Sequence, residues 1–174
     1  PRYQDLIDRH IMPEMQQLIS IFPQQQGQPN PSDSTIRATL ASLDVINMLN
    51  TRYVILNPQG RPLQNLSAEG NAWFVEEIRR VNSPDEEIAA LNQIDPSQAA
   101  AVDVDIRAGA YGQQLDGLQL QPDPQARVTL TDWAPNRLVY QSQSSQEGVI
   151  VFSEVYYNSG KGWQRSEEHT SELQ

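Results

Sequence analysis

The sequence predicts an α+β fold in which N-terminal helices accompany a mainly antiparallel, sandwich-like β-sheet. Apolar residues recur at spacings of three and four in residues 3–21 and 36–49, which indicates two amphipathic helices. Residues 128–132 alternate between apolar and polar side chains, residues 134–136 form a turn signal, and residues 137–140 are again typical of a strand. This second pattern indicates a β-hairpin in the C-terminal half.

The N-terminal part is expected to contain a helical arm and a connection. The first amphipathic helix includes Pro13, which predicts an interruption or a bend because proline lacks an N–H donor. Residues 23–34 are rich in Gln and Pro, which is typical of a loop. We therefore expect a helical arm at residues 1–22, a linker at residues 23–34 and an α+β domain at residues 35–164.

The domain is expected to begin with a helix and a short strand. Ser34 can cap the second helix, because its hydroxyl can accept a hydrogen bond from a free amide of the first turn, and Asn50 is a plausible end. Residues 53–56 predict a short buried strand, and the Asn-Pro-Gln-Gly sequence at residues 57–60 predicts the turn that ends it.

The middle of the chain predicts a strand, a helix and another strand. Residues 72–81 are aromatic and β-branched at their start, which favours a strand. Ser83, followed by Pro and acidic residues, predicts the start of a short helix that extends to Asn92. Residues 100–104 predict a brief strand, and the Gly- and Gln-rich residues 109–125 predict an exposed loop.

The run at residues 147–163 contains the clearest strand pattern of the sequence. Residues 148–157 are expected to form the third strand of an antiparallel meander that begins with the hairpin. Both faces of this strand are apolar, which predicts a central strand covered on both sides. Glu154 lies among these apolar residues, where an ionised carboxylate needs a hydrogen-bond partner.

The last ten residues differ in character from everything before them. Residues 165–174, RSEEHTSELQ, match the translation of a common sequencing adapter, and we interpret them as an artefactual tail. The chain also begins with Pro1 rather than Met. We therefore expect a fragment of a longer protein, truncated at both ends.

Composition excludes several classes of function. The chain has 12 basic and 22 acidic residues and a net charge of −10, which changes to −8 without the one Arg and three Glu of residues 165–174. Nucleic-acid binding depends mainly on Lys and Arg, so an acidic chain without a basic stripe is not expected to bind nucleic acid. The absence of Cys excludes disulfides, zinc–thiolate sites and thiol nucleophiles. No run of residues is long and apolar enough to predict a transmembrane helix.

Patterns that would indicate catalysis or metal binding are weak. Asp103 and Asp105 have the Asp-x-Asp spacing of metal-binding carboxylates, but such short matches are common in an acidic chain, and we favour a solvated face. His10 is the only histidine outside the tail, and we interpret it as a surface or interface residue. No Ser-His-Asp, Cys-His, HExxH or P-loop pattern is present. We therefore assign no catalytic residue and no metal ligand.

Five residues are candidates for contact with a glycan. Aromatic rings can stack on a sugar, and a carboxylate can accept hydrogen bonds from ligand hydroxyls. The alternative for the aromatic residues is a place in the core, and the alternative for the carboxylate is a structural hydrogen bond. The candidates are Glu154, Trp73, Tyr156, Tyr157 and Trp163.

Several phrases follow one another in a specific order. They are RYQDLIDRHI at residues 2–11, VINMLNTRYVIL at residues 45–56, GNAWFVEEI at residues 70–78, DEEIAALNQID at residues 85–95, and APNRLVY with EGVIVFSEVYYNSGKGW near the end. Taken together, they resemble the YfhO family of bacterial membrane proteins, in the form of its Bacteroidetes members. The resemblance covers nearly all of residues 2–163.

The resemblance implies a role in the cell envelope. Members of the family are polytopic membrane proteins similar to glycosyltransferases that use lipid-linked sugar donors. By resemblance, this chain corresponds to a soluble region at the extracytoplasmic face of the bacterial inner membrane, with the transmembrane part of the same protein and a cell-envelope glycan as partners. The lipid-linked donor and the catalytic carboxylate would then belong to the upstream part, and no cofactor is implied here.

The sequence therefore leads to two hypotheses about function. The first is an extracytoplasmic part that covers the active site of a membrane glycosyltransferase or helps to bind its glycan. The alternative is a non-catalytic binding or scaffold domain of a membrane protein that has no transferase activity.

Overall fold

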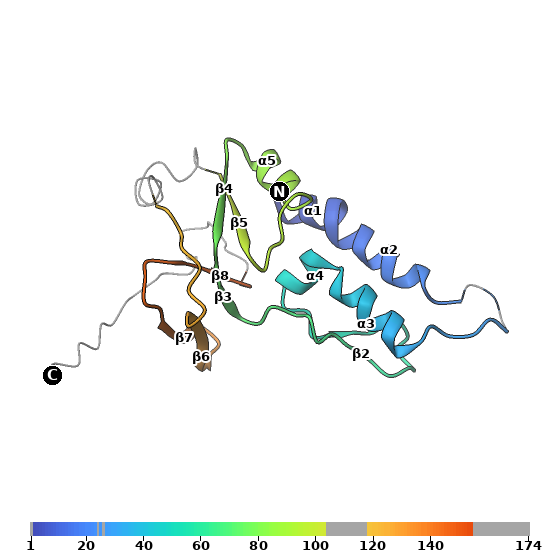
Figure 1. The fold of residues 1–174 in the computed structure, drawn as a ribbon. Helices are drawn as coiled ribbons and strands as arrows, with labels where there is room; N and C mark the ends of the chain where they lie inside the picture. Colours follow the sequence, from blue (N-terminus) through green and yellow to red (C-terminus); the bar gives the residue numbers. More distant parts are fainter. Residues whose placement is uncertain (1, 24, 26, 104–117, 155–174) are drawn as a thin grey trace.

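The computed structural model describes residues 2–23, 25, 27–103 and 118–154, and these have the predicted α+β fold, with helices at the N-terminus and mainly antiparallel strands after them (Figure 1). The elements in chain order are α1 (Arg2–Leu6), the π-helix η1 (Ile7–Ile11), α2 (Met12–Ser20), α3 (Asp33–Ala41), α4 (Asp44–Met48), β1 (Tyr53–Val54), β2 (Leu63–Gln64), β3 (Ala72–Val75), β4 (Glu77–Val81), α5 (Pro84–Ala90), β5 (Ala99–Asp103), β6 (Arg127–Ala134), β7 (Arg137–Gln143) and β8 (Val149–Phe152).

The first helix is interrupted where Pro13 predicts it. The wider π-helical turn η1 ends at Ile11, and Pro13 occupies the first turn of α2. Proline cannot donate a backbone hydrogen bond in a helix interior, and a π-helical turn is one way in which a helix accommodates a local irregularity. The interruption therefore separates α1 and α2 without a loop.

The second predicted helix is divided in two. Ser32, rather than Ser34, is the cap of α3, and its Oγ accepts from the amide of Thr35. The expected cap was wrong by two residues because the helix already begins at Asp33. Asn50 does end the helical region, with a left-handed backbone at φ 54°.

A carboxylate from α2 caps the start of α4. Glu14 accepts hydrogen bonds from the backbone amides of Val45 at 2.9 Å and Ile46 at 2.8 Å, whereas Leu43 before the helix offers no side-chain cap. Burial raises the pKa of the Glu14 carboxyl, although the two backbone donors act in the opposite direction. This contact joins two helices that are distant in the sequence.

The main core lies between the helices and the strands β1 and β2. Its buried members come from α2, α3, the α3–α4 connection, α4 and β1, so the predicted helical arm at residues 1–22 shares one core with the predicted domain. Partly buried side chains such as Met15 and Leu63 close its margins. The core residues are Leu18, Leu40, Leu43, Ile46 and Val54.

The described strands form four ribbons of two strands each. β1–β2, β3–β8 and β6–β7 are antiparallel, and β4–β5 is parallel. The single strand predicted at residues 72–81 is divided at Glu76, because the carbonyl of Gln98 accepts from the amides of both Glu76 and Glu77. The long strand therefore serves two different partners along its length (Figure 1).

The C-terminal strand does not continue the meander. The predicted hairpin is confirmed as β6–β7, but β8 pairs with β3, so the expectation of a third meander strand was wrong. Trp73 lies opposite Val151 and Phe74 opposite Ile150 in the ladder. Apolar cross-strand pairs of this kind stabilise a ribbon, and this gain decides the partner over sequence proximity.

The predicted strand at residues 53–56 is shorter and less buried than expected. β1 contains only Tyr53 and Val54, and Val54 is buried whereas Tyr53 is 61% exposed. Ile55 is 64% exposed. One face of this ribbon therefore packs on the core, and the other is open. The predicted turn at residues 57–60 is present, since the amide of Gly60 donates to the carbonyl of Asn57 at 2.9 Å.

Replacing Leu18 by Ala should lower the free energy of unfolding by about 3 kcal/mol, because a fully buried leucine leaves a cavity. Ile19→Ala is the matched control, because Ile19 is next to Leu18 in the sequence but its side chain is 45% exposed. This variant should lower the free energy of unfolding by less than about 1 kcal/mol. Urea denaturation followed by far-UV circular dichroism measures both. Equal losses in the two variants would contradict the position of the core.

Candidate functional site

A cleft in the described part of the chain lies beside β3, and we name it the β3 cleft. It has a volume of about 370 Å³ and is open to solvent. It combines apolar, aromatic and charged residues from three separate segments, which is typical of a binding site. The lining residues are Ala72, Trp73, Phe74, Val75, Glu76, Leu120, Gln121, Asp123, Ala126, Arg127, Val128, Ser144, Glu147 and Gly148.

The aromatic part of the cleft depends on a glycine. A Cβ atom added to Gly148 would lie 3.0 Å from Cδ1 and Cε1 of Phe74, which is closer than most Cβ contacts in proteins. The ring of Phe74 therefore packs directly over the backbone at Gly148. A larger residue at position 148 would displace this ring.

The predicted candidate Trp73 lines the cleft but is largely buried. Its side chain is 9% exposed, and its indole N–H donates to the carbonyl of Pro96 at 2.9 Å. Alternation along β3 places Trp73 and Val75 on the buried face and Phe74 on the other. Phe74, which the sequence also offers as a stacking aromatic, is therefore the better candidate of the two, and strand alternation was the signal for choosing it over Trp73.

Asp123 organises one wall of the cleft. Its Oδ2 accepts from the amide of Ser145 at 2.7 Å, from Oγ of Ser145 at 2.8 Å and from Oγ of Ser144 at 3.1 Å, and its Oδ1 accepts from the amide of Gln125 at 2.9 Å. These donors stabilise the ionised form and lower the pKa of Asp123 to about 2. The carboxylate thus holds the β7–β8 loop against the segment before β6.

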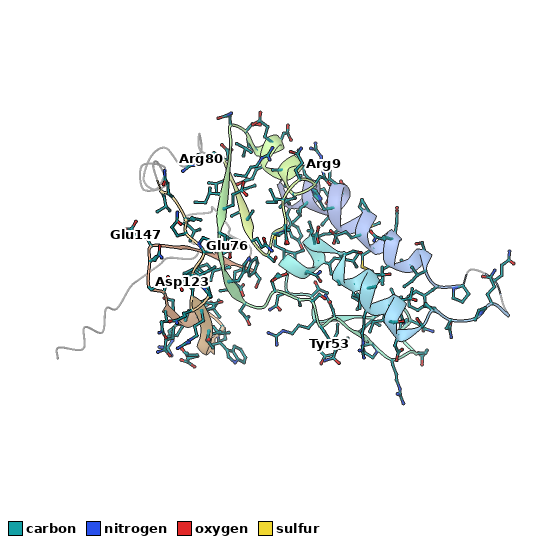
Figure 2. All side chains as sticks on the ribbon, in the orientation of Figure 1. Arg9, Tyr53, Glu76, Arg80, Asp123 and Glu147 are labelled. Carbon is teal, nitrogen blue, oxygen red and sulfur yellow. The ribbon has the colours of Figure 1, made fainter. Side chains whose placement is uncertain are left out.

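The charges around the cleft are mainly negative. Glu76, Asp123 and Glu147 contribute carboxylates, and Arg127 contributes the single guanidinium among the lining residues. Figure 2 labels the three carboxylates on the same side of the molecule, next to β3 and the hairpin. Arg127 also donates to Oε1 of Gln143 across the β6–β7 ladder. The cleft is therefore suited to a neutral or cationic ligand with hydroxyl or amine donors.

The other glycan candidates do not join Trp73 in the cleft. Glu154 lies just after β8 and is exposed, so its carboxylate is solvated rather than enclosed by apolar residues. Tyr156, Tyr157 and Trp163 lie outside the described residues.

Burial and the charge of Glu154 raise the pKa of Tyr140, whose hydroxyl is buried without a hydrogen-bond partner among the described residues.

His10 is not a surface residue. It is 5% exposed, and its Nε2 lies 2.8 Å from the carbonyl oxygen of Ile88. A carbonyl only accepts, so Nε2 is the protonated nitrogen of this contact. Of the two expected positions, surface or interface, the surface one was wrong, because His10 lies between η1 and α5. Its partner α5 follows much later in the sequence, so no local pattern shows this contact.

Asp103 does not lie on a solvated face. It is 1% exposed, and its backbone amide donates to Oε1 of Glu87 at 3.3 Å. Asp105 lies outside the described residues. Within the described ranges, no group of three or more His, Cys, Asp or Glu residues is arranged to hold a metal ion.

A second, smaller cavity gathers three carboxylates that the sequence did not bring together. Asp44, Glu69 and Asp95 line a space of about 150 Å³ together with Asn47 and Ser97. Burial, followed by the charge of Asp95, raises the pKa of Asp44 and of Glu69. The three residues come from α4 and two loops, so no local sequence signal could have revealed the group.

Comparison with protein families, with curated proteins and with solved structures finds no match for this chain. In the part of the chain that the structure describes, no helix has the length and apolar character needed to cross a membrane.

The Asp44–Glu69–Asp95 group should make stability rise as the pH falls. The raised pKa values mean that the folded state binds more protons than the unfolded state between the ordinary carboxyl pKa and the raised one, so lowering the pH through this window favours folding. Glu69→Gln should therefore stabilise the protein at pH 7. The gain should be only roughly a few tenths of a kcal/mol, because the carboxylates of Asp44 and Glu69 are both partly solvated.

Urea denaturation at several pH values between 4 and 7 measures this effect, since that range begins near the ordinary Glu pKa of about 4.3. Glu77→Gln is the control, because the Glu77 side chain on β4 is exposed, and it should leave the pH dependence unchanged. A Glu69→Gln variant that is less stable at pH 7, or that keeps the full pH dependence, would contradict the repulsion.

The contacts of Asp123 should persist into strong acid. A lowered pKa means that the bonds to the carboxylate are complete above its ordinary pKa and are lost as the pH falls through about 2. The amide resonance of Ser145 in a two-dimensional NMR spectrum should titrate with that midpoint, and Asp123→Asn should abolish the titration. A midpoint near the ordinary Asp value of about 4 would show that the loop is not held in this way.

Proposed function

We propose that this chain is a non-catalytic glycan-binding part of a larger membrane protein, located at the extracytoplasmic face of the bacterial inner membrane, and that the glycan binds in the β3 cleft. Two kinds of observation support the proposal. The ordered phrases between residues 2 and 163 resemble the YfhO family, whose members are similar to glycosyltransferases that use lipid-linked sugars. The cleft supplies the surface on which a glycan can rest.

The observation that best supports glycan binding is the combination of an aromatic ring and several carboxylates in one open cleft. A sugar ring presents C–H groups on its faces, which pack on an aromatic side chain such as Phe74, and hydroxyls at its edge, which donate to carboxylates such as Glu76 and Glu147. The excess of negative charge favours a neutral or amino sugar over a phosphorylated one.

Binding fits the cleft better than catalysis. A general acid or base works best with a pKa near the operating pH, but the pKa of Asp123 is lowered to about 2 and its carboxylate is engaged by four donors. His10 is committed to the carbonyl of Ile88 on a different part of the molecule. Any sugar transfer is therefore assigned to the transmembrane part of the parent protein.

Titration with neutral and amino-containing cell-envelope oligosaccharides tests the proposal. The backbone NMR signals of residues 74, 145 and 148 should shift more than those of residues away from the cleft. Phe74→Leu removes the aromatic face while keeping an apolar side chain, and it should weaken binding about fivefold, because an aromatic contact contributes on the order of 1 kcal/mol. Glu147→Gln should weaken binding by a smaller factor.

Asp132→Asn is the matched control, because Asp132 is exposed on the hairpin, pairs with Arg137 and does not line the cleft. It should leave glycan affinity unchanged. No binding of any such oligosaccharide, or signals that shift elsewhere, would reject the glycan proposal and favour a scaffold role.

A further inference from the structure

The β3 cleft carries more negative charge than its own basic residue can balance. Three carboxylates and one guanidinium line it, which gives the lining a net charge of −2. The carboxylates come from three separate segments, since Glu76 follows β3, Asp123 precedes β6 and Glu147 precedes β8 (Figure 2). A ligand that brings a positive charge into the cleft would therefore be attracted by charge that the protein leaves uncompensated.

The hydrogen bonds of the cleft do not cancel these negative charges. The four donors to Asp123 are backbone amides and serine hydroxyls, which are neutral, so they stabilise its carboxylate without removing the charge. With a pKa of about 2, Asp123 stays ionised at neutral and weakly acidic pH. Glu76 and Glu147 are exposed, and within the described ranges no hydrogen bond or ion pair engages their side chains.

Arg127 does not supply the missing positive charge. Its guanidinium donates to Oε1 of Gln143, which lies opposite it in the β6–β7 ladder and is neutral. The other basic residue of the hairpin is Arg137, which pairs with Asp132 outside the cleft. The hairpin therefore places one cation beside three carboxylates and has no second one to offer.

The aromatic ring of the cleft lies close to two of the carboxylates. Val75 and Val149 are the last pair of the β3–β8 ladder, and Glu76 and Gly148 come directly beyond them. The ring of Phe74 packs over Gly148, and Glu147 precedes this glycine. A cation in front of such a ring is attracted by the ring's negative face while it donates to neighbouring carboxylates.

We infer that the β3 cleft selects a glycan with free amino groups and binds it in the ammonium form. This inference rests on the proposed glycan binding and adds the charge of the ligand. An ammonium group carries three N–H donors and a positive charge, whereas an acetylated amine carries one N–H donor and no charge. A metal ion is a poorer match, because in the described part of the chain the carboxylates do not form a group arranged to hold one.

Two oligosaccharides that differ only at nitrogen test the inference, namely a short oligomer of glucosamine and its N-acetylated counterpart of the same length and linkage. At about pH 6 both charges are present, because this pH lies above the ordinary Glu pKa of about 4.3 and below the value of about 7.7 for an α-amino group. Isothermal titration calorimetry should show about fivefold tighter binding of the amine form, as expected for exposed charges. Salt at about 1 M should remove most of this preference.

Variants of the lining residues should change the preference in opposite directions. Glu76→Gln and Glu147→Gln should each lower it about twofold, because each removes one charge but keeps a polar side chain. Arg127→Gln should raise it, because it removes the guanidinium that repels the ammonium group. Glu77→Gln is the matched control, since Glu77 is next to Glu76 and exposed but does not line the cleft, and it should keep the preference of the wild type.

Equal or tighter binding of the acetylated oligomer would overturn the selection of amines but leave glycan binding in the cleft intact. The same holds if Glu77→Gln lowers the preference as much as Glu76→Gln, because the effect would then come from the net charge of the chain. If neither oligomer binds, both the proposed function and this inference fail. Circular dichroism should show all variants folded, since each substitution changes an exposed side chain.

Discussion

Each described strand belongs to a ribbon of only two strands, and the rest of the structure follows from this constraint. A two-stranded ribbon is at best marginally stable in water, because it buries one face at most and has no central strand. Every ribbon therefore needs a cover from another element. The helices and the β1–β2 ribbon share the largest buried cluster, and the face of β1–β2 opposite that cluster is the one that stays open.

Single side-chain contacts join the ribbons and helices that no common ladder connects. Glu14 caps α4 from α2, His10 bonds α5 from η1, and Trp73 bonds the carbonyl of Pro96 from β3. A further link is the buried pair Asn47 and Asn65, whose side chains lie 2.8 Å apart and tie α4 to the segment after β2. A buried polar group without its partner is costly, so these contacts fix the relative positions of elements that hydrophobic burial alone would leave variable.

Local sequence signals predicted the elements, whereas the contacts between distant segments could not be read from them. Ser83 caps α5 as expected, through a bond from the amide of Glu86, because the signal and its target are three residues apart. The partner of β8 was missed because β3 lies more than 70 residues earlier and carries no mark of its partner. The same reason hid the burial of His10, the Asp44–Glu69–Asp95 group, and the assembly of the β3 cleft from three segments.

Asn71 connects the residue before β1 to the β3 cleft. Its side-chain oxygen accepts from Arg52 at 3.4 Å, and its carbonyl accepts from the amide of Ser153, just after β8, at 3.1 Å. Asn71 also directly precedes Ala72, which lines the β3 cleft. The strand that carries Phe74 is therefore held at its start from two sides, by a residue next to β1 and by a residue next to β8, although β1 shares no ladder with either β3 or β8.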